Sequence, residues 1–218
     1  MARSPQLEKQ WALLDHQDYQ SAVDETQALL GRLRGADQRD AYRLLAWARY
    51  HLHEFSQASF WFGRACQGSE DANDWLNLAL AQVRDGDIAA AELSFEQVRL
   101  CQQVARFAQR PGFYLQLCWY ASALCDARQP ARVAPLLDEL AEACRRLGSS
   151  DTTLLYCSGM PFLSSVLALA VRHFGQQGQR AEGAAWMQKL AAALDEGGRR
   201  RVQRAIEELR GEGEQPEA

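Results

Sequence analysis

The sequence contains few residues that favour β-strands. Among its 218 residues there are 8 Val, 2 Ile and 3 Thr, against 35 Ala. β-branched side chains fit a pleated sheet and restrict helices, whereas Ala, Leu and Gln are good helix formers. The shortage of β-branched residues therefore argues against a β-rich or α/β fold, and the composition predicts an all-α protein.

Long apolar runs and a strong charge excess are also missing. No run approaches the roughly 18 apolar residues of a membrane helix, so no membrane partner is expected. A net charge of −4 gives no general reason to bind nucleic acid or anionic lipid. The first ten residues lack the apolar core of a secretory signal, which predicts a cytoplasmic protein. The bias toward 22 Arg over 2 Lys, with the Ala excess, suggests a GC-rich coding sequence of bacterial type.

No cysteine pattern of a disulfide framework is present. The six cysteines are scattered through apolar, helix-forming stretches of a chain that is too large to need covalent staples. We expect free, buried thiols and a reducing compartment. These residues are Cys66, Cys101, Cys118, Cys125, Cys144 and Cys157.

The sequence contains a repeated pattern of aromatic, small and apolar residues. Residues 75–98 read as two amphipathic helices joined by a Gly86-Asp87 turn, with large aromatic, small and apolar residues at fixed offsets. This pattern resembles the tetratricopeptide repeat (TPR) family, whose unit is a helical hairpin of 34 residues. The residues that carry the resemblance are Trp75, Leu78, Ala79, Gly86, Asp87, Ile88, Ala91, Phe95 and Val98.

Other segments fit the same template less well. A shift of 33 residues toward the N-terminus aligns Tyr42, Ala58 and Phe62, and a further 36 aligns Tyr19 and Ala22 in a degenerate first unit. Two weaker units follow, with turn positions at Ala131 and Arg180. Their wider spacing predicts longer helices or inserts, and we interpret residues 149–160 as an insert between units four and five. Arg110-Pro111-Gly112 is expected to separate two helices.

The resemblance implies an all-α, right-handed superhelix of about five helical hairpins plus a C-terminal cap helix. Small residues at Ala22, Ala58, Ala91 and Ala134 would let the second helix of each unit approach the first. Gly197-Gly198 is expected to break the chain before the cap. The predicted units are residues 3–36, 39–72, 72–105, 115–148 and 164–196, with the cap at 199–210, in one domain of residues 1–210 followed by a disordered acidic tail at 211–218.

No constellation typical of an enzyme stands out. His51 and His53 are two positions apart, on different sides of a helix, so they cannot share one metal. Glycine-rich phosphate loops are absent. The run Arg199–Arg201 could bind phosphate, but Glu207 and Glu208 favour a solvated helix. We therefore expect no catalytic residue, no metal and no cofactor.

A peptide groove is the function that the resemblance implies. The concave wall of the superhelix would carry aromatic and apolar residues with a few polar heads. Trp47, Tyr50 and Trp119 would provide apolar burial, while polar side chains set the orientation of the partner. The alternative that the tryptophans are core residues stays open. The predicted partner-binding residues are Trp11, Arg43, Trp47, Tyr50, Asn77, Trp119 and Arg172.

The expected function is therefore a non-catalytic scaffold that binds a peptide or helix of a partner protein. The Lys, Arg and Asn residues that hold an acidic C-terminal tail in some co-chaperones of this family are missing, since Leu7, Trp11, Leu44, Asn73 and Asn77 occupy their positions. Two alternatives remain open. One is a sensor whose superhelix responds to a ligand. The other is a subunit that forms a homodimer through the exposed edge of the fifth unit or through the insert around Leu154–Tyr156.

Overall fold

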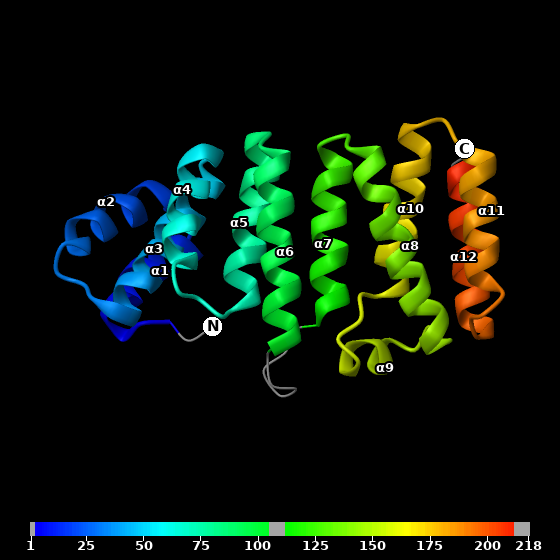
Figure 1. The fold of residues 1–218 in the computed structure, drawn as a ribbon, viewed down its shortest axis with the longest axis horizontal. Coiled ribbons are helices and arrows are strands. Elements are labelled where there is room, and N and C mark those ends of the chain that lie inside the picture. Colours follow the sequence, from blue (N-terminus) through cyan, green and yellow to red (C-terminus); the bar gives the residue numbers. More distant parts are fainter. Residues whose placement is uncertain (1–2, 105–111, 212–218) are drawn as a thin grey trace, which may run out of the picture. The chain divides into compact units, whose positions relative to one another are not determined.

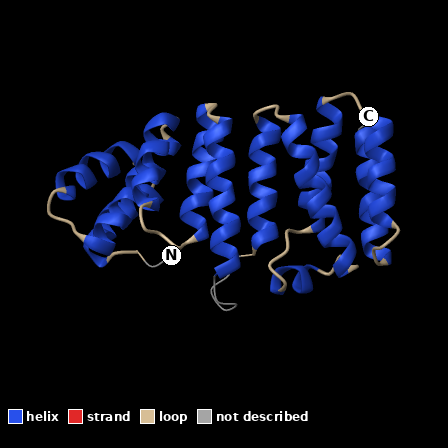
Figure 2. Cartoon of the chain, viewed as in Figure 1, coloured by secondary structure: helices blue, strands red, loops and turns tan. Residues whose placement is uncertain are grey.

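All regular structure in the described residues is helical. The computed structural model describes residues 3–104 and 112–211, and within these ranges Figure 2 shows helices and loops but no strand. The all-α prediction is confirmed. In the same ranges, no helix is both long and apolar enough to cross a membrane.

The chain divides into two compact units, residues 1–109 and 110–218. In the first unit each helix packs against the next one along the chain, from α1 to α6 (Figure 1). The elements of this unit are a 3-10 turn at Pro5–Leu7, then α1 (Glu8–Asp15), α2 (Tyr19–Leu30), α3 (Gly35–His51), α4 (Phe55–Cys66), α5 (Ala72–Asp85) and α6 (Ile88–Val104).

The second unit also packs neighbour against neighbour, with one interruption. Helix α9 is a single short helix between two longer pairs, so α8 packs against α10, and α12 packs against both α10 and α11. The helices of this unit are α7 (Phe113–Asp126), α8 (Pro130–Leu147), α9 (Thr152–Cys157), α10 (Leu163–Gln176), α11 (Arg180–Ala191) and α12 (Glu196–Arg210).

Five helix-to-helix turns share one backbone conformation. In each, a residue one or two positions after the first helix is left-handed, and the following N–H reaches back five positions, as from Asp18 to the Leu13 carbonyl at 2.9 Å. This is the Schellman arrangement, which satisfies the last carbonyls of a helix. Only the third of these turns has the Gly-Asp sequence. The left-handed residues are Gln17, His53, Gly86, Arg128 and Gly178.

The predicted alignment of the fourth hairpin is wrong by one residue. Val133 is fully buried and Ala134 is exposed, so Val133 takes the place that Ala22 takes in the first hairpin. Helix α8 begins at Pro130 because proline lacks an N–H and has a backbone angle that suits the first position of a helix. Close approach of these two helices therefore depends on a valine rather than an alanine.

The C-terminal helix begins earlier than expected. Helix α12 starts at Glu196 and includes Gly197 and Gly198 in its first turn, because Asp195 caps it by accepting the Gly198 N–H at 2.7 Å. A Cβ atom on Gly198 would lie 2.8 Å from that of Leu194, so the position requires glycine. The apolar stripe of this helix is buried, at Val202, Ala205, Ile206 and Leu209.

The predicted insert contains helix α9 and a close backbone contact. A Cβ atom on Gly112, the residue before α7, would lie 2.1 Å from the carbonyl oxygen of Gly159. The insert is therefore fixed against the start of α7. On α9, Leu155 is buried, whereas Leu154 and Tyr156 are exposed. Arg110 and Pro111 of the predicted break, and residues 212–218 of the predicted tail, lie outside the described residues.

The cysteines are free thiols, as predicted, and five of the six are buried. Burial raises the pKa of Cys66 to about 12 and those of Cys118 and Cys144 to about 11, which keeps these thiols protonated and unreactive at neutral pH. Cys157, at the end of α9, is the exposed exception.

Candidate interaction surface

Helix α3 carries three of the predicted partner-binding residues on one stripe. Arg43, Trp47 and Tyr50 are spaced by four and three positions, which places them on the same helix face. All three are half-buried. The stripe runs toward the end of α3, where the chain turns into α4.

Trp47 belongs to both the core and the surface. Its ring packs against two buried apolar clusters and meets Phe62 edge-on, with 5.5 Å between ring centroids. On its other side it contacts Tyr50 at 5.8 Å and His51 at 6.0 Å. The two alternatives for this tryptophan, core or surface, are therefore both partly correct.

The rings around Trp47 extend beyond the predicted residues. Tyr19 stacks on His51 with centroids 4.7 Å apart, and Phe55 meets Tyr50 edge-on at 5.3 Å. We call Tyr19, Trp47, Tyr50, His51 and Phe55 the aromatic cluster. Its members come from the starts of α2 and α4 and from the end of α3, and each retains some solvent exposure.

The electrostatics of the aromatic cluster favour a neutral surface. Desolvation of its ring lowers the pKa of His51, and the neighbouring His53 lowers it further. The His51 ring that stacks on Tyr19 is therefore mainly uncharged at neutral pH. Sequence reasoning treated His51 only as a metal ligand. Its spacing of four from Trp47 could have placed it beside that ring, but nothing local pointed to Tyr19.

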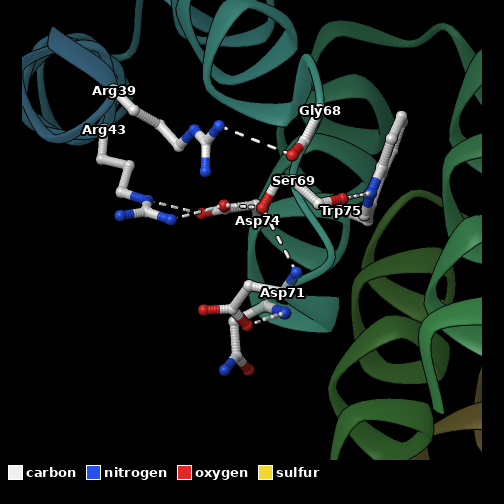
Figure 3. A network of polar contacts seen from close by, with 8 residues as sticks. Arg39, Arg43, Gly68, Ser69, Asp71, Asp74 and Trp75 are labelled. Atoms are coloured by element: carbon white, nitrogen blue, oxygen red, sulfur yellow. Dashed lines mark hydrogen bonds and ion pairs between the residues drawn. The ribbon is translucent and has the colours of Figure 1, made fainter. Parts of the chain in front are cut away.

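Arg43 is held by a buried carboxylate. Its guanidinium donates from Nε and from a terminal nitrogen to the two oxygens of Asp74, at 2.7 and 2.6 Å. Figure 3 shows this pair from close by, with Ser69 also donating to Asp74. The Asp74 side chain is 1% exposed, and the bond to it raises the pKa of Arg43. Arg43 therefore joins α3 to α5, and its charge is already neutralised.

Trp11 has a similar internal role. Its indole N–H donates to Asp40 at 2.9 Å, and the same carboxylate oxygen accepts the Ser4 N–H at 2.7 Å. Only 8% of Trp11 is exposed. The predicted groove residue therefore links α1 to α3 and presents little surface to a partner.

The remaining predicted residues differ in their environment. Asn77 on α5 is buried in the first unit, as Trp11 is. Trp119 and Arg172 belong to the second unit. Trp119 on α7 is 49% exposed, whereas Arg172 on α10 pairs with Asp126 at 2.8 Å. The structure thus brings Arg43, Trp47 and Tyr50 together on one helix.

Comparisons with known proteins add no second source of inference. No family model, no curated protein and no solved structure matches the chain. Among the described residues, no group of three or more His, Cys, Asp or Glu side chains is placed to hold a metal ion. The function is therefore inferred from the residues and geometry of this chain alone.

Proposed function

We propose that the chain is a non-catalytic interaction module with a TPR-like architecture, and that its aromatic cluster binds an apolar segment of a partner protein. The aromatic cluster carries this proposal, because it is a group of rings that is neither fully buried nor free to move. Tyr and Trp provide most of the binding energy at many protein interfaces, since each buries a large area at a low cost in side-chain entropy.

The repeated turns support the TPR-like part of the proposal. Five hairpins end their first helix in the same way although their turn sequences differ, and four of the five place a small residue at the matching position of the second helix. These small residues are Ala22, Ala58, Ala91 and Gly183. Hairpins of this kind bury a continuous core when they stack, and a right-handed superhelix would be the result.

The rigidity of the aromatic cluster supports the binding part. Trp47 is wedged against Phe62 and two core clusters, and Tyr50 is held between Trp47 and Phe55. Rings that are already fixed lose little freedom when a partner docks. Because Asp74 neutralises Arg43 and His51 is uncharged, the surface selects apolar anchors, such as one face of an amphipathic helix.

Two of the predicted residues have a different role in this proposal. Trp11 and Arg43 position the helices, while Trp47 and Tyr50 contact the partner. Trp119, with its large exposed fraction, is a further contact candidate in the second unit. The partner is defined by its chemistry, as a short segment with one or two large apolar side chains.

The test uses peptides selected from a random display library against the purified full chain. We expect Tyr50→Ala to weaken the selected peptides about tenfold or more, as loss of an interface hot spot does. Phe60→Ala is the matched control, because Phe60 is a 53% exposed ring on α4 that lies outside the aromatic cluster. Peptide affinity can be measured by fluorescence anisotropy, and circular dichroism checks that both variants fold.

Unchanged affinity in a folded Tyr50→Ala variant would reject the aromatic cluster as the binding surface. An equal loss in Phe60→Ala would also reject it, since the effect would then not depend on the ring cluster. Selection of peptides without large apolar residues would contradict the proposed chemistry of the partner.

A further inference from the structure

A polar cavity lies in the first unit, apart from the aromatic cluster. Its volume is about 190 Å³, and it lies between the beginning of α3 and the end of α4. Two arginines face it from these two helices, together with two amide side chains and one phenol. The lining residues are Gly35, Gln38, Arg39, Tyr42, Arg64 and Gln67. We call it the Arg39–Arg64 pocket.

Arg64 is held in place by Tyr42. Its guanidinium carbon lies 5.2 Å from the centre of the Tyr42 ring, and one terminal nitrogen donates to the Tyr42 hydroxyl at 3.2 Å. Tyr42 itself is only 8% exposed and stacks on Trp61 with ring centroids 5.7 Å apart. A guanidinium has five N–H donors, so this arrangement fixes Arg64 and leaves most of its donors available.

Arg39 is similarly available. Among the described residues its hydrogen bond goes to the Gly68 carbonyl at 3.5 Å, at the outer limit for such a bond (Figure 3). Within residues 3–104 and 112–211, neither Arg39 nor Arg64 has a carboxylate within ion-pair distance. Two positive charges therefore line one cavity without a matching negative charge.

Three acidic residues on α3 and α5 already have partners other than Arg39 and Arg64. Asp37 accepts the Ser4 hydroxyl at 2.7 Å, and Asp40 accepts Trp11. Asp74 pairs with Arg43. These three carboxylates therefore do not pair with Arg39 or Arg64 in the folded unit.

The start of α3 offers backbone N–H donors to the pocket, and its first turn also carries the carboxylate of Asp37. No side chain caps this helix, whose first residue, Gly35, lines the pocket. Uncapped N–H groups at the start of a helix attract anions. The planar guanidinium group of an arginine can donate two parallel hydrogen bonds to the oxygens of a phosphate group, a geometry that the ammonium group of lysine does not offer. The amides of Gln38 and Gln67 offer further donors.

We propose that the Arg39–Arg64 pocket binds a phosphate group. The group could belong to free inorganic phosphate or to a phosphorylated side chain of a polypeptide, since both present the same oxygens. The proposal does not depend on peptide binding at the aromatic cluster, because the two sites share no residue.

The test is a titration of the full chain with two probes, inorganic phosphate and a phosphoserine pentapeptide. Sodium chloride holds the ionic strength constant, because screening alone changes the stability of a charged protein. Binding is followed by NMR shifts and by the rise in melting temperature. We expect Arg39→Gln and Arg64→Gln each to weaken phosphate at least tenfold. Arg84→Gln, which removes the same charge outside the pocket, should leave the affinity unchanged.

The outcomes separate the sources of the phosphate. Binding of inorganic phosphate alone assigns a free anion, and binding of the phosphopeptide but not of its unphosphorylated form assigns a phosphorylated polypeptide. Equal binding by wild type and a folded Arg39→Gln/Arg64→Gln variant, or no binding of either probe, would overturn the proposal. Arg64→Lys keeps the charge without the fork and should also weaken binding, so the proposal remains testable if the Gln variants fail to fold.

Discussion

The two units of the chain differ in how deeply the carboxylates that join their helices are buried, since Asp126, which pairs with Arg172 in the second unit, is more exposed than Asp74 in the first. In the first unit, buried carboxylates connect helices that are separated in the sequence, as Asp40 does with Trp11 and Asp74 with Arg43. In the second unit, backbone segments meet directly at Gly112 and Gly159. Both units nevertheless use the same turn within their hairpins, so the backbone repeat does not require a repeat of the side-chain contacts.

A capping carboxylate adds to the contacts of the second unit. Asp195 accepts the N–H and the hydroxyl of Ser150, both at 2.7 Å, as well as the Gly198 N–H. It therefore ties the loop after α8 to the start of α12. The contrast predicts distinct sensitivities. The stability of the first unit should fall most when one partner of a charge pair is removed. The stability of the second unit should fall most when a side chain is added at a glycine contact or when the pH is lowered.

The largest effect is expected when the Arg43–Asp74 pair is broken on one side. Arg43→Met leaves a buried carboxylate without its guanidinium, which should lower the free energy of unfolding by about 3 kcal/mol. The double variant Arg43→Met/Asp74→Leu should recover more than half of this loss, because both charges are then gone. Urea denaturation of the two single variants and the double variant measures the coupling free energy between Arg43 and Asp74. A loss in the double variant equal to the sum of the two single losses would contradict the coupling.

A smaller loss of stability is expected when a methyl group is added at the contact between Gly112 and Gly159. Gly112→Ala places a methyl group against the Gly159 backbone, which cannot move aside as a side chain can, and should cost about 2 kcal/mol. Gly175→Ala is the matched control within the same unit. Its new methyl group would meet only Leu209, at an ordinary 3.8 Å, so a gain of about 0.5 kcal/mol is expected. Thermal unfolding compares the two, and similar melting temperatures would show that the Gly112 contact is not tight.

The smallest loss of stability is expected when Asp195 is replaced, and this loss should depend on pH. Removal of this cap by Asp195→Ala should cost about 1 kcal/mol at pH 7. The hydrogen bonds from Ser150 and Gly198 hold the pKa of Asp195 well below its usual range. Its contribution is therefore complete above the unfolded pKa of about 4 and is lost as the pH falls toward the folded value. The stability difference from wild type should shrink between pH 4 and pH 2 in urea titrations, and a constant difference would contradict the capping role.

Much of the fold was predictable from local sequence. Ala-rich, weakly β-branched segments and recurring apolar positions are sufficient to predict helical hairpins, because helix formation depends on contacts within a few residues. The third hairpin, with its Gly86-Asp87 turn, is the clearest example. The fourth was misaligned because a template that expects a small residue prefers Ala134, whereas Pro130 fixes the start of the helix and places Val133 inside.

The candidate site was predicted only in part. Trp47 and Tyr50 were found because their spacing places them on one face of α3. Tyr19, in contrast, reaches the aromatic cluster through the packing of α2 against α3, and it stacks on His51, which lies 32 positions later in the chain. No local pattern encodes such a contact.

The sequence by itself determined that this chain forms helices and which residues share a helix face. Those properties follow from local propensity, capping and periodicity. Only the tertiary structure decided which polar residues are paired. It joined Trp11 and Arg43 to internal carboxylates and left Arg39 and Arg64 without one among the described residues. Such contacts form between side chains that meet in space, whatever their separation along the chain.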